Sequence, residues 1–213
     1  MSGTLSRVES ARPYGGVEAA DRLAERRHRL LQAGLHILGS DSDLSALTVR
    51  GICRQAGVTA RYFYESFTDK DDFVAAVYDW VIADIAASTQ AAVAAARPRD
   101  RARAAMTNIV AMIVEEPRIG RLLFGSDLAY PVLARKRVQA GELMAMLTRE
   151  QAVGTFQVSE NEKVKAAAYF VVGGVVQTIG AWLSGGVELE PDQLVDQLAS
   201  MIDQLADPRL YTD

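Results

Sequence analysis

The apolar residues of this 213-residue chain recur at intervals of three and four positions, and no segment alternates between apolar and polar residues with a period of two. Leu23, Leu30, Leu35 and Leu38, for example, fall on one face of a helix with 3.6 residues per turn. A chain with this spacing buries its apolar residues by packing helices against helices. The sequence therefore predicts an all-α protein.

Turn-forming and capping residues divide the pattern into separate helices. Residues 1–18 mix Ser, Gly, Pro and charges without periodicity, which indicates a flexible arm. Thr48, Thr59 and Asp69 are each suited to cap the start of a helix, because their side-chain oxygens can accept hydrogen bonds from its first free N–H groups. Prolines and glycines separate the later helices, which we expect over residues 98–116, 118–126, 131–151, 159–184 and 191–206.

The pattern of residues 47–70 predicts a short helix, a sharp turn at Gly57 and a second short helix. In a helix-turn-helix, the first turn of the second helix enters the major groove of DNA. Arginine can offer two donors to guanine, so Arg61 is the first candidate for direct readout. The residues expected at the base edges are Thr59, Ala60, Arg61 and Tyr62. Those expected at the phosphates are Thr48, Arg50, Tyr64 and Lys70.

The side chains of this segment also have an ordinary structural interpretation. Aromatic residues at helical spacing usually belong to a core, and we assign Phe63 and Phe67 to it. Tyr62 and Tyr64 could either pack or contact DNA, and an isolated Arg or Lys on a helix is usually a solvated cation. The clustering of these residues around one turn favours contact with DNA.

The formal net charge of −4 does not by itself indicate a nucleic-acid partner, but its distribution along the chain is uneven. Residues 22–29 and 48–70 each contain four Arg or Lys residues against one or two acids. Residues 182–213 contain seven acids and one base. The predicted DNA-binding end is therefore locally positive, and the C-terminal end is not.

Residues 20–75 resemble the DNA-binding domain of the TetR family of bacterial regulators. The positions that carry the resemblance are Thr48, Ala56-Gly57-Val58-Thr59, Tyr64, Phe67, Lys70 and Phe73. The run Arg61-Tyr-Phe-Tyr-Glu-Ser-Phe67 looks like one branch of that family found in actinobacteria. Phe63 and Phe73 stand where many members carry leucine, a difference that a core tolerates.

The resemblance implies about nine helices in two domains. Residues 19–68 would form a helix-turn-helix DNA-binding domain, and residues 69–213 a ligand-binding and dimerisation domain. The eighth and ninth helices of two subunits would pack as a four-helix bundle. Residues 159–184 are apolar nearly all round, as expected of a helix buried on both sides, although a core helix within one subunit would show the same pattern. The interface residues expected are Val172, Val175, Ile179, Trp182, Leu194, Leu198 and Met201.

The resemblance also implies that the middle helices enclose a ligand pocket. Each candidate for its lining could equally be an ordinary core residue. Flexible methionines would suit a pocket that accepts varied apolar molecules. The candidates are Met106, Ile109, Met112, Ile113, Leu123, Phe124, Leu143, Met144, Met146, Leu147, Phe170 and Gln177.

The function implied by the resemblance is that of a repressor. As a homodimer it would bind palindromic double-stranded operator DNA, and a small apolar effector would release it. A transcriptional activator and a ligand-independent architectural DNA binder are alternatives. An enzyme is not expected: both histidines lie in the first helix, no Glu-x-x-His motif occurs, and no glycine-rich phosphate loop follows a strand. We therefore expect no catalytic residue, cofactor or metal site.

One stretch, Ala166 to Val187, carries no charged side chain over 22 residues, a length that could span a membrane. Its five glycines and its Gln, Thr and Ser residues favour a buried helix of a soluble protein instead. The first thirty residues lack the continuous apolar run of a secretory signal. We therefore expect a cytoplasmic protein without membrane contact, which also agrees with a single cysteine, Cys53.

Overall fold

The computed structural model describes residues 14–40, 44–125, 130–156 and 161–205, and within these residues the chain forms nine α-helices, two short 3-10 helices and no strand. The all-α prediction is therefore confirmed. The helices are α1 (Tyr14–Leu38), α2 (Val49–Ala56), α3 (Ala60–Ser66), α4 (Lys70–Ala95), α5 (Arg101–Glu115), α6 (Pro117–Phe124), α7 (Pro131–Phe156), α8 (Glu162–Leu183) and α9 (Pro191–Gln204), with 3-10 turns at Leu44–Ala46 and Pro98–Asp100.

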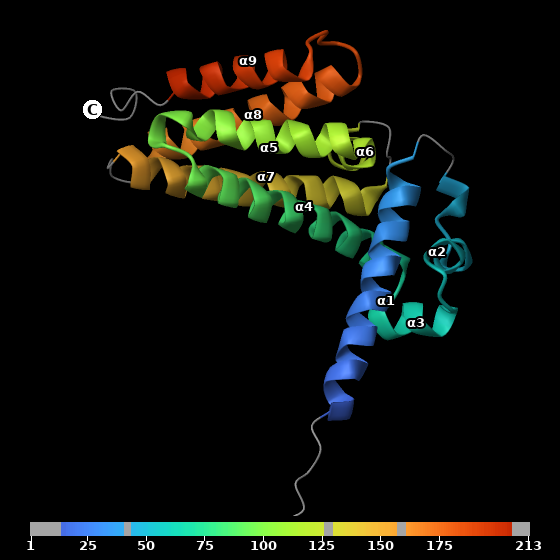
Figure 1. Ribbon diagram of the computed structural model, residues 1–213. Coiled ribbons are helices and arrows are strands. Elements are labelled where there is room, and N and C mark those ends of the chain that lie inside the picture. Colours follow the sequence, from blue (N-terminus) through green and yellow to red (C-terminus); the bar gives the residue numbers. More distant parts are fainter. Residues whose placement is uncertain (1–13, 41–43, 126–129, 157–160, 206–213) are drawn as a thin grey trace, which may run out of the picture.

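Helices α1 to α3 gather at one end of the molecule, and α4 to α9 lie beside one another as a helical bundle (Figure 1). Within the bundle α4 packs on α5 and α7, α7 on α8, and α5 on α9. Helix α4 also contacts α1, so it belongs to the packing of both parts. The two-part architecture expected from the sequence is present, with α4 as the shared element.

Several helix boundaries differ from those expected, among them the start of α1, the end of α7 and the start of α8. Helix α1 begins at Tyr14, so the last five residues of the expected arm 1–18 are helical, and the rest of that arm lies outside the described residues. Extending an established helix adds one hydrogen bond for each residue that is fixed, which explains why Gly15 and Gly16 do not stop it. Helix α7 continues to Phe156. Helix α8 is capped by Asn161, whose Oδ1 accepts a hydrogen bond from Val164 N at 3.0 Å.

The core of the N-terminal part is built on three phenylalanine rings. Phe63 and Phe73 are fully buried with ring centroids 5.4 Å apart, and Phe67 meets Phe73 edge to face at 5.1 Å. Pairs in this geometry contribute about 0.5–1.5 kcal/mol beyond the area that they bury. Because Phe73 is the fourth residue of α4, the same cluster fixes the start of α4 against α3.

Among the described helices, one is long and apolar enough to cross a membrane, which is helix α8. The same length and composition are found in core helices of soluble proteins. One face of α8 packs on α6 and α7, where Val164, Ala168 and Ile179 are buried. Its other face is exposed, so the interpretation as a core helix enclosed within one subunit is wrong.

Helix α1 approaches α4 at Gly34, where a side chain has no room. A methyl group there would lie 2.7 Å from Cζ of Phe73 and would overlap Cγ2 of Val77. We expect Gly34→Ala to lower the free energy of unfolding by about 1–3 kcal/mol, because the core must move to admit the methyl group. Urea denaturation followed by circular dichroism would measure this.

The matched control is Gly141→Ala in α7, where nothing lies within 4 Å of the new methyl group. There the higher helix propensity of alanine should raise stability by up to about 1 kcal/mol. An unchanged or raised stability of Gly34→Ala would show that α1 and α4 are not closely packed.

Candidate nucleic-acid interface and ligand cavity

Local interactions fix the turn between α2 and α3. Thr48 Oγ1 accepts a hydrogen bond from Gly51 N at 3.0 Å, which caps α2 as expected. Gly57 has φ 65°, a left-handed conformation that few residues other than glycine adopt, and Val58 N then donates to Cys53 O at 3.0 Å. The chain leaves α2 at a sharp angle, and α3 begins at Ala60, three residues after Gly57.

Helix α3 buries one face and exposes the other. Phe63 points into the core, whereas Ala60, Arg61 and Tyr64 are exposed, Tyr64 by 60%. Thr59 precedes the helix in an extended conformation, is exposed, and makes no side-chain capping hydrogen bond. Four of the residues predicted for DNA contact thus lie on the open face of α3, and the expected cap at Thr59 is absent.

Arg61 and Tyr62 differ in how accessible they are. The Arg61 side chain is 84% exposed and its Nε lies 2.9 Å from Glu65 Oε1, an i,i+4 pair of the kind that contributes about 0.3–0.5 kcal/mol. DNA could displace that pair easily. Tyr62 is half-buried, and the guanidinium of Arg26 lies 4.1 Å from the centre of its ring. Tyr62 therefore packs α3 against α1 as well as bordering the exposed face.

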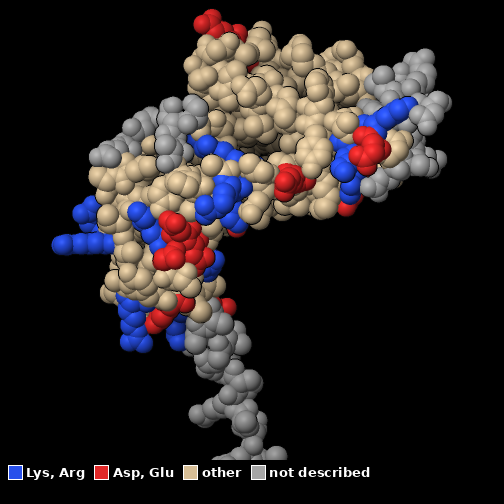
Figure 2. All heavy atoms as spheres, turned by 180° about the vertical axis from the view of Figure 1, so that it is seen from behind, with Lys and Arg blue, Asp and Glu red and all other residues tan. Residues whose placement is uncertain are grey.

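Three of the predicted phosphate contacts lie at the starts of α2 and α4, and the fourth, Tyr64, lies on α3. Arg50 is exposed in the first turn of α2, and Lys70 is the first residue of α4, next to the capping residue Asp69. Lys70 Nζ lies 5.6 Å from the ring centre of Tyr130, just before α7. The hydroxyl of Tyr130 donates to Asp71 at 2.7 Å, so the residue that precedes α7 contacts the start of α4 directly. Figure 2 shows basic side chains projecting from this end of the molecule.

Arg27 has a structural role that the sequence did not reveal. Its Nη1 donates to Ser66 O, the last carbonyl of α3, at 3.0 Å, and its guanidinium lies 4.5 Å from the ring centre of Phe67. One side chain thus ties α1 to the C-terminal end of α3. The cluster of arginines in residues 22–29 was the available signal, but spacing alone could not separate a positioning arginine from a solvated one.

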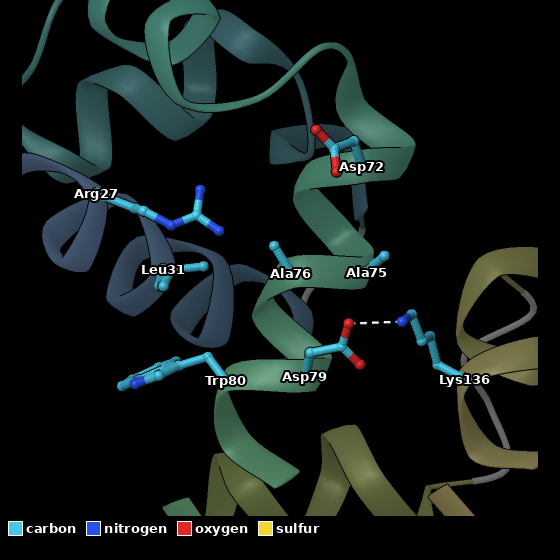
Figure 3. Close-up of a pocket in the computed structure, with 8 residues that line it drawn as sticks. All are labelled: Arg27, Leu31, Asp72, Ala75, Ala76, Asp79, Trp80 and Lys136. Carbon is cyan, nitrogen blue, oxygen red and sulfur yellow. Dashed lines mark hydrogen bonds and ion pairs between the residues drawn. The ribbon is translucent and has the colours of Figure 1, made fainter. Parts of the chain in front are cut away.

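A shallow groove lies where α1, α4 and α7 meet (Figure 3). Its volume is about 540 Å³, and its charged groups are already paired. Lys136 Nζ lies 2.5 Å from Asp79 Oδ2, and Asp72 accepts hydrogen bonds from Thr68. These interactions join α7 to α4, so we interpret the groove as a packing junction between helices and not as a ligand site.

A second junction joins α6 to the end of α1. Arg121 Nε donates to Gly39 O at 2.5 Å, and Arg118 Nη1 lies 2.6 Å from His36 Nδ1. Arg118 also pairs with Glu116, and this hydrogen bond lowers the pKa of that carboxyl group. No side chain fits at Gly39, where a methyl group would lie 2.5 Å from Arg118 O.

Helices α4, α5, α7, α8 and α9 enclose an elongated cavity of about 1420 Å³ with a mainly apolar lining. It is larger than a typical ligand pocket of about 300–1,000 Å³. Six of the candidates line it: Met106, Ile109, Leu123, Phe124, Met144 and Leu147. The other six do not line it: Met112, Ile113, Leu143, Met146, Phe170 and Gln177.

Two features of the structure keep these six residues away from the cavity. Ile113 is buried in the core on a side of α5 away from the cavity, and Met112 contacts Ser88 on α4. Leu143, Met146 and Phe170 are exposed, as is Gln177. Helices α7 and α8 carry apolar residues on more than one face, so periodicity could not show which face turns inward.

The same ambiguity affected the predicted dimer interface. Ile179, Leu194 and Leu198 are buried within the subunit, where they pack in its core and are not exposed to a partner. Val172 and Val175 line the cavity, and Trp182 is half-buried with its Nε1 donating to Leu189 O at 2.8 Å. Met201 alone among the seven is mostly exposed. The apolar residues that α8 and α9 expose are Tyr169, Phe170, Val176, Leu183 and Met201.

These features define a class of protein: a helix-turn-helix DNA-binding domain joined through α4 and α6 to a helical domain that encloses a cavity. Residues 36–77 match the family of bacterial regulatory proteins named tetR. No curated protein matches the sequence as a whole.

Solved structures extend the likeness to the second domain. A regulator assigned to the TetR family from a Rhodococcus species superposes with a TM-score of 0.67 at 18% identity, over 86% of this chain and 100% of its own. The fatty acid degradation regulator FadR from Bacillus halodurans gives 0.68 at 12% identity, over 83% and 94%. FadR from Bacillus subtilis, solved in complex with stearoyl-CoA, gives 0.63 at 11% identity, over 82% and 96%.

Residues 36–77 thus match the TetR family, as the motifs of residues 20–75 indicated, and the fold of the described residues is similar to that of solved TetR-family regulators. The match to the bacterial regulatory proteins lies over the helix-turn-helix, and the likeness of fold extends over both domains.

The role of Arg27 can be tested by removing its side chain. We expect Arg27→Ala to lower stability by about 1 kcal/mol and to weaken hydrogen-exchange protection of the α3 amides, because the hydrogen bond to Ser66 O is lost. The control is Arg29→Ala, an exposed arginine two residues along α1. Equal protection of α3 in both variants would contradict the positioning role.

Proposed function

We propose that this chain is a homodimeric transcriptional repressor that binds a palindromic operator and leaves it when a small molecule fills the cavity. The observation that carries the proposal is the shared helix α4. Its first residues pack against the helix-turn-helix, and its later residues, including Ile82 and Ile85, line the cavity. A conformational change at the cavity would therefore be transmitted to α3 through one continuous helix.

In this proposal α3 enters the major groove of double-stranded DNA. Arg61 would leave its pair with Glu65 and donate to a guanine, and Thr59, Ala60 and Tyr62 would border the same base edges. Thr48, Arg50, Tyr64 and Lys70 would contact phosphates and set the register. Half of a palindromic site would be read by each subunit, since two reading helices related by a two-fold axis match such a sequence.

The second copy would dock on the exposed apolar face of α8 and α9. Phe170 is 70% exposed and Met201 is 51% exposed, and such side chains are characteristic of a surface that a partner covers. Gly174 faces open space and does not line the cavity, since a methyl group added there would have no atom within 4 Å, so a partner helix could approach closely at this position. Figure 2 shows that the bundle carries few charges on the face in view.

The effector would act by population shift. A ligand that fits the cavity in only one arrangement of α4, α6 and α7 favours that arrangement, and the two reading helices then no longer match half-sites about one turn apart. The structure of FadR from Bacillus subtilis in complex with stearoyl-CoA supports this part of the proposal, because its fold is similar. A protein with this role would work in the cytoplasm and would need no catalytic group or cofactor. The boundary between its DNA-binding domain and its second domain would lie near residue 68.

The first test is operator binding. Fluorescence anisotropy at physiological salt would compare the promoter region of the chain's own gene with random DNA of equal length. We expect Arg61→Ala to reduce the preference for the promoter by about 1–3 kcal/mol, because a bidentate base contact is lost. We expect Lys70→Ala to weaken binding to both DNAs and to reduce the salt slope by about one unit.

Arg50→Ala serves as a second phosphate variant, because Lys70 also contacts Tyr130. Full specificity in Arg61→Ala would remove the readout assignment. If the wild type showed no preference for any promoter segment, the proposal of a specific regulator would fail.

The dimer is tested separately by light scattering. We expect Phe170→Glu to convert a dimer into a monomer, because a charge at the centre of an apolar interface must be desolvated. Val114→Glu is the matched control, since it places the same charge on an exposed apolar residue of α5. A dimer that survives Phe170→Glu would show that the subunits meet elsewhere.

A further inference from the structure

The cavity of the second domain is apolar along most of its length, but it contains one cationic group near the end that faces the DNA-binding domain. Arg137 on α7 lines this end together with Tyr78 on α4 and Leu123 on α6. The opposite end, at the C-terminal part of α4 and the start of α5, is bordered by other polar and charged side chains. Arg99 and Arg101 lie at that opposite end, so Arg137 is the cation of the end that faces the DNA-binding domain.

The guanidinium of Arg137 lacks a carboxylate partner within the described residues. Its Nη2 donates to the backbone carbonyl of Leu122 at 3.1 Å, and its Nε is buried without a hydrogen-bond partner. The neighbouring Lys136, by contrast, is paired with Asp79. Arg137 is half-buried, and a partly buried charge without a counter-charge is costly; its buried Nε–H without an acceptor adds to that cost. Among the residues that the structure describes, this site thus supplies no anionic acceptor.

Tyr78 provides a second donor at the same place. Its side chain is buried on α4, and no hydrogen bond joins its hydroxyl to any other described residue. Burial raises the pKa of Tyr78 to about 12, and the positive charge of Arg137 acts in the opposite direction, so the two groups are near each other. The hydroxyl therefore keeps its proton at neutral pH and can donate it in a hydrogen bond.

We propose that the cavity binds a molecule with a long apolar body and one carboxylate, and that Arg137 and Tyr78 hold the carboxylate. This proposal rests on the proposed function, since it names the chemical class of the effector. The apolar body would lie along α5, α7 and α8, where Met106, Met144 and Leu147 form the wall. Flexible methionines adapt to chains of different shape.

A ligand bound at Arg137 would also affect the packing of the DNA-binding domain. A carboxylate is a stronger acceptor for a guanidinium than a backbone carbonyl is, so it competes with Leu122 O for Arg137. Leu122 lies next to Arg121, which donates to Gly39 O at the end of α1. The head group of the ligand would thus loosen α7 from α6 at the junction that holds α1.

The experiment uses calorimetry on the full chain at pH 7.5 with three probes that share a ten-carbon body: decanoate, 1-decanol and decyltrimethylammonium. We expect decanoate to bind at least about tenfold more tightly than decanol, the ratio that a hydrogen bond to a charged group supplies. In Arg137→Gln the two affinities should become equal, with that of decanol unchanged. Tyr78→Phe should weaken decanoate binding less, by about threefold to tenfold.

Arg135→Gln is the matched control, because Arg135 is exposed on the same helix and does not line the cavity. It should leave all three affinities unchanged. If Arg137→Gln does not fold, the comparison of the three probes on the wild type still tests whether the cavity prefers a carboxylate head group.

Equal affinity of decanoate and decanol, or preference for the cationic probe, would overturn the head-group proposal and leave ligand binding itself intact. Binding of none of the three probes would overturn it as well. Anisotropy with promoter DNA is measured independently, so a failure of the regulator proposal would be recognised as a separate result.

Discussion

The packing of Phe73 against Phe63 and Phe67 is the interaction on which the rest of the structure depends. These rings join the reading helix α3 to the first turn of α4. Because α4 then continues for about six further turns as a wall of the cavity, the cluster ties the DNA-binding domain to the second domain without a flexible linker. Arg27 holds the other end of α3, so the exposed face of that helix is fixed at both ends.

The two domains differ in how strongly their sequences specify them. In the N-terminal domain, Thr48, Gly57 and Phe63 each have one physical role, in a cap, a left-handed turn and a core, and the corresponding features follow from the residues alone. In the second domain, α7 and α8 are apolar on several faces. The sequence predicts that these helices exist, but only the three-dimensional packing shows that Ile179 is inside and Phe170 outside.

The residues that sequence reasoning missed are mostly charged side chains that connect distant segments. Arg27, Arg121 and Arg137 look like ordinary surface cations in the sequence, yet each donates to a backbone carbonyl of another helix or of its end. Spacing along one helix predicts contacts three and four residues away. This spacing does not show which backbone carbonyl a guanidinium contacts when that carbonyl lies far away in the sequence.

The length of α4 has a mechanical consequence. Its 26 residues form a rod about 39 Å long, so tilting the cavity end by about 5° moves the other end by about 3 Å. That displacement equals the length of a hydrogen bond, and a bidentate contact to a base tolerates much less. In the proposed mechanism a ligand would need to shift its surroundings only slightly, because a helix of this length would act as a lever that converts a small rotation into a loss of register on DNA.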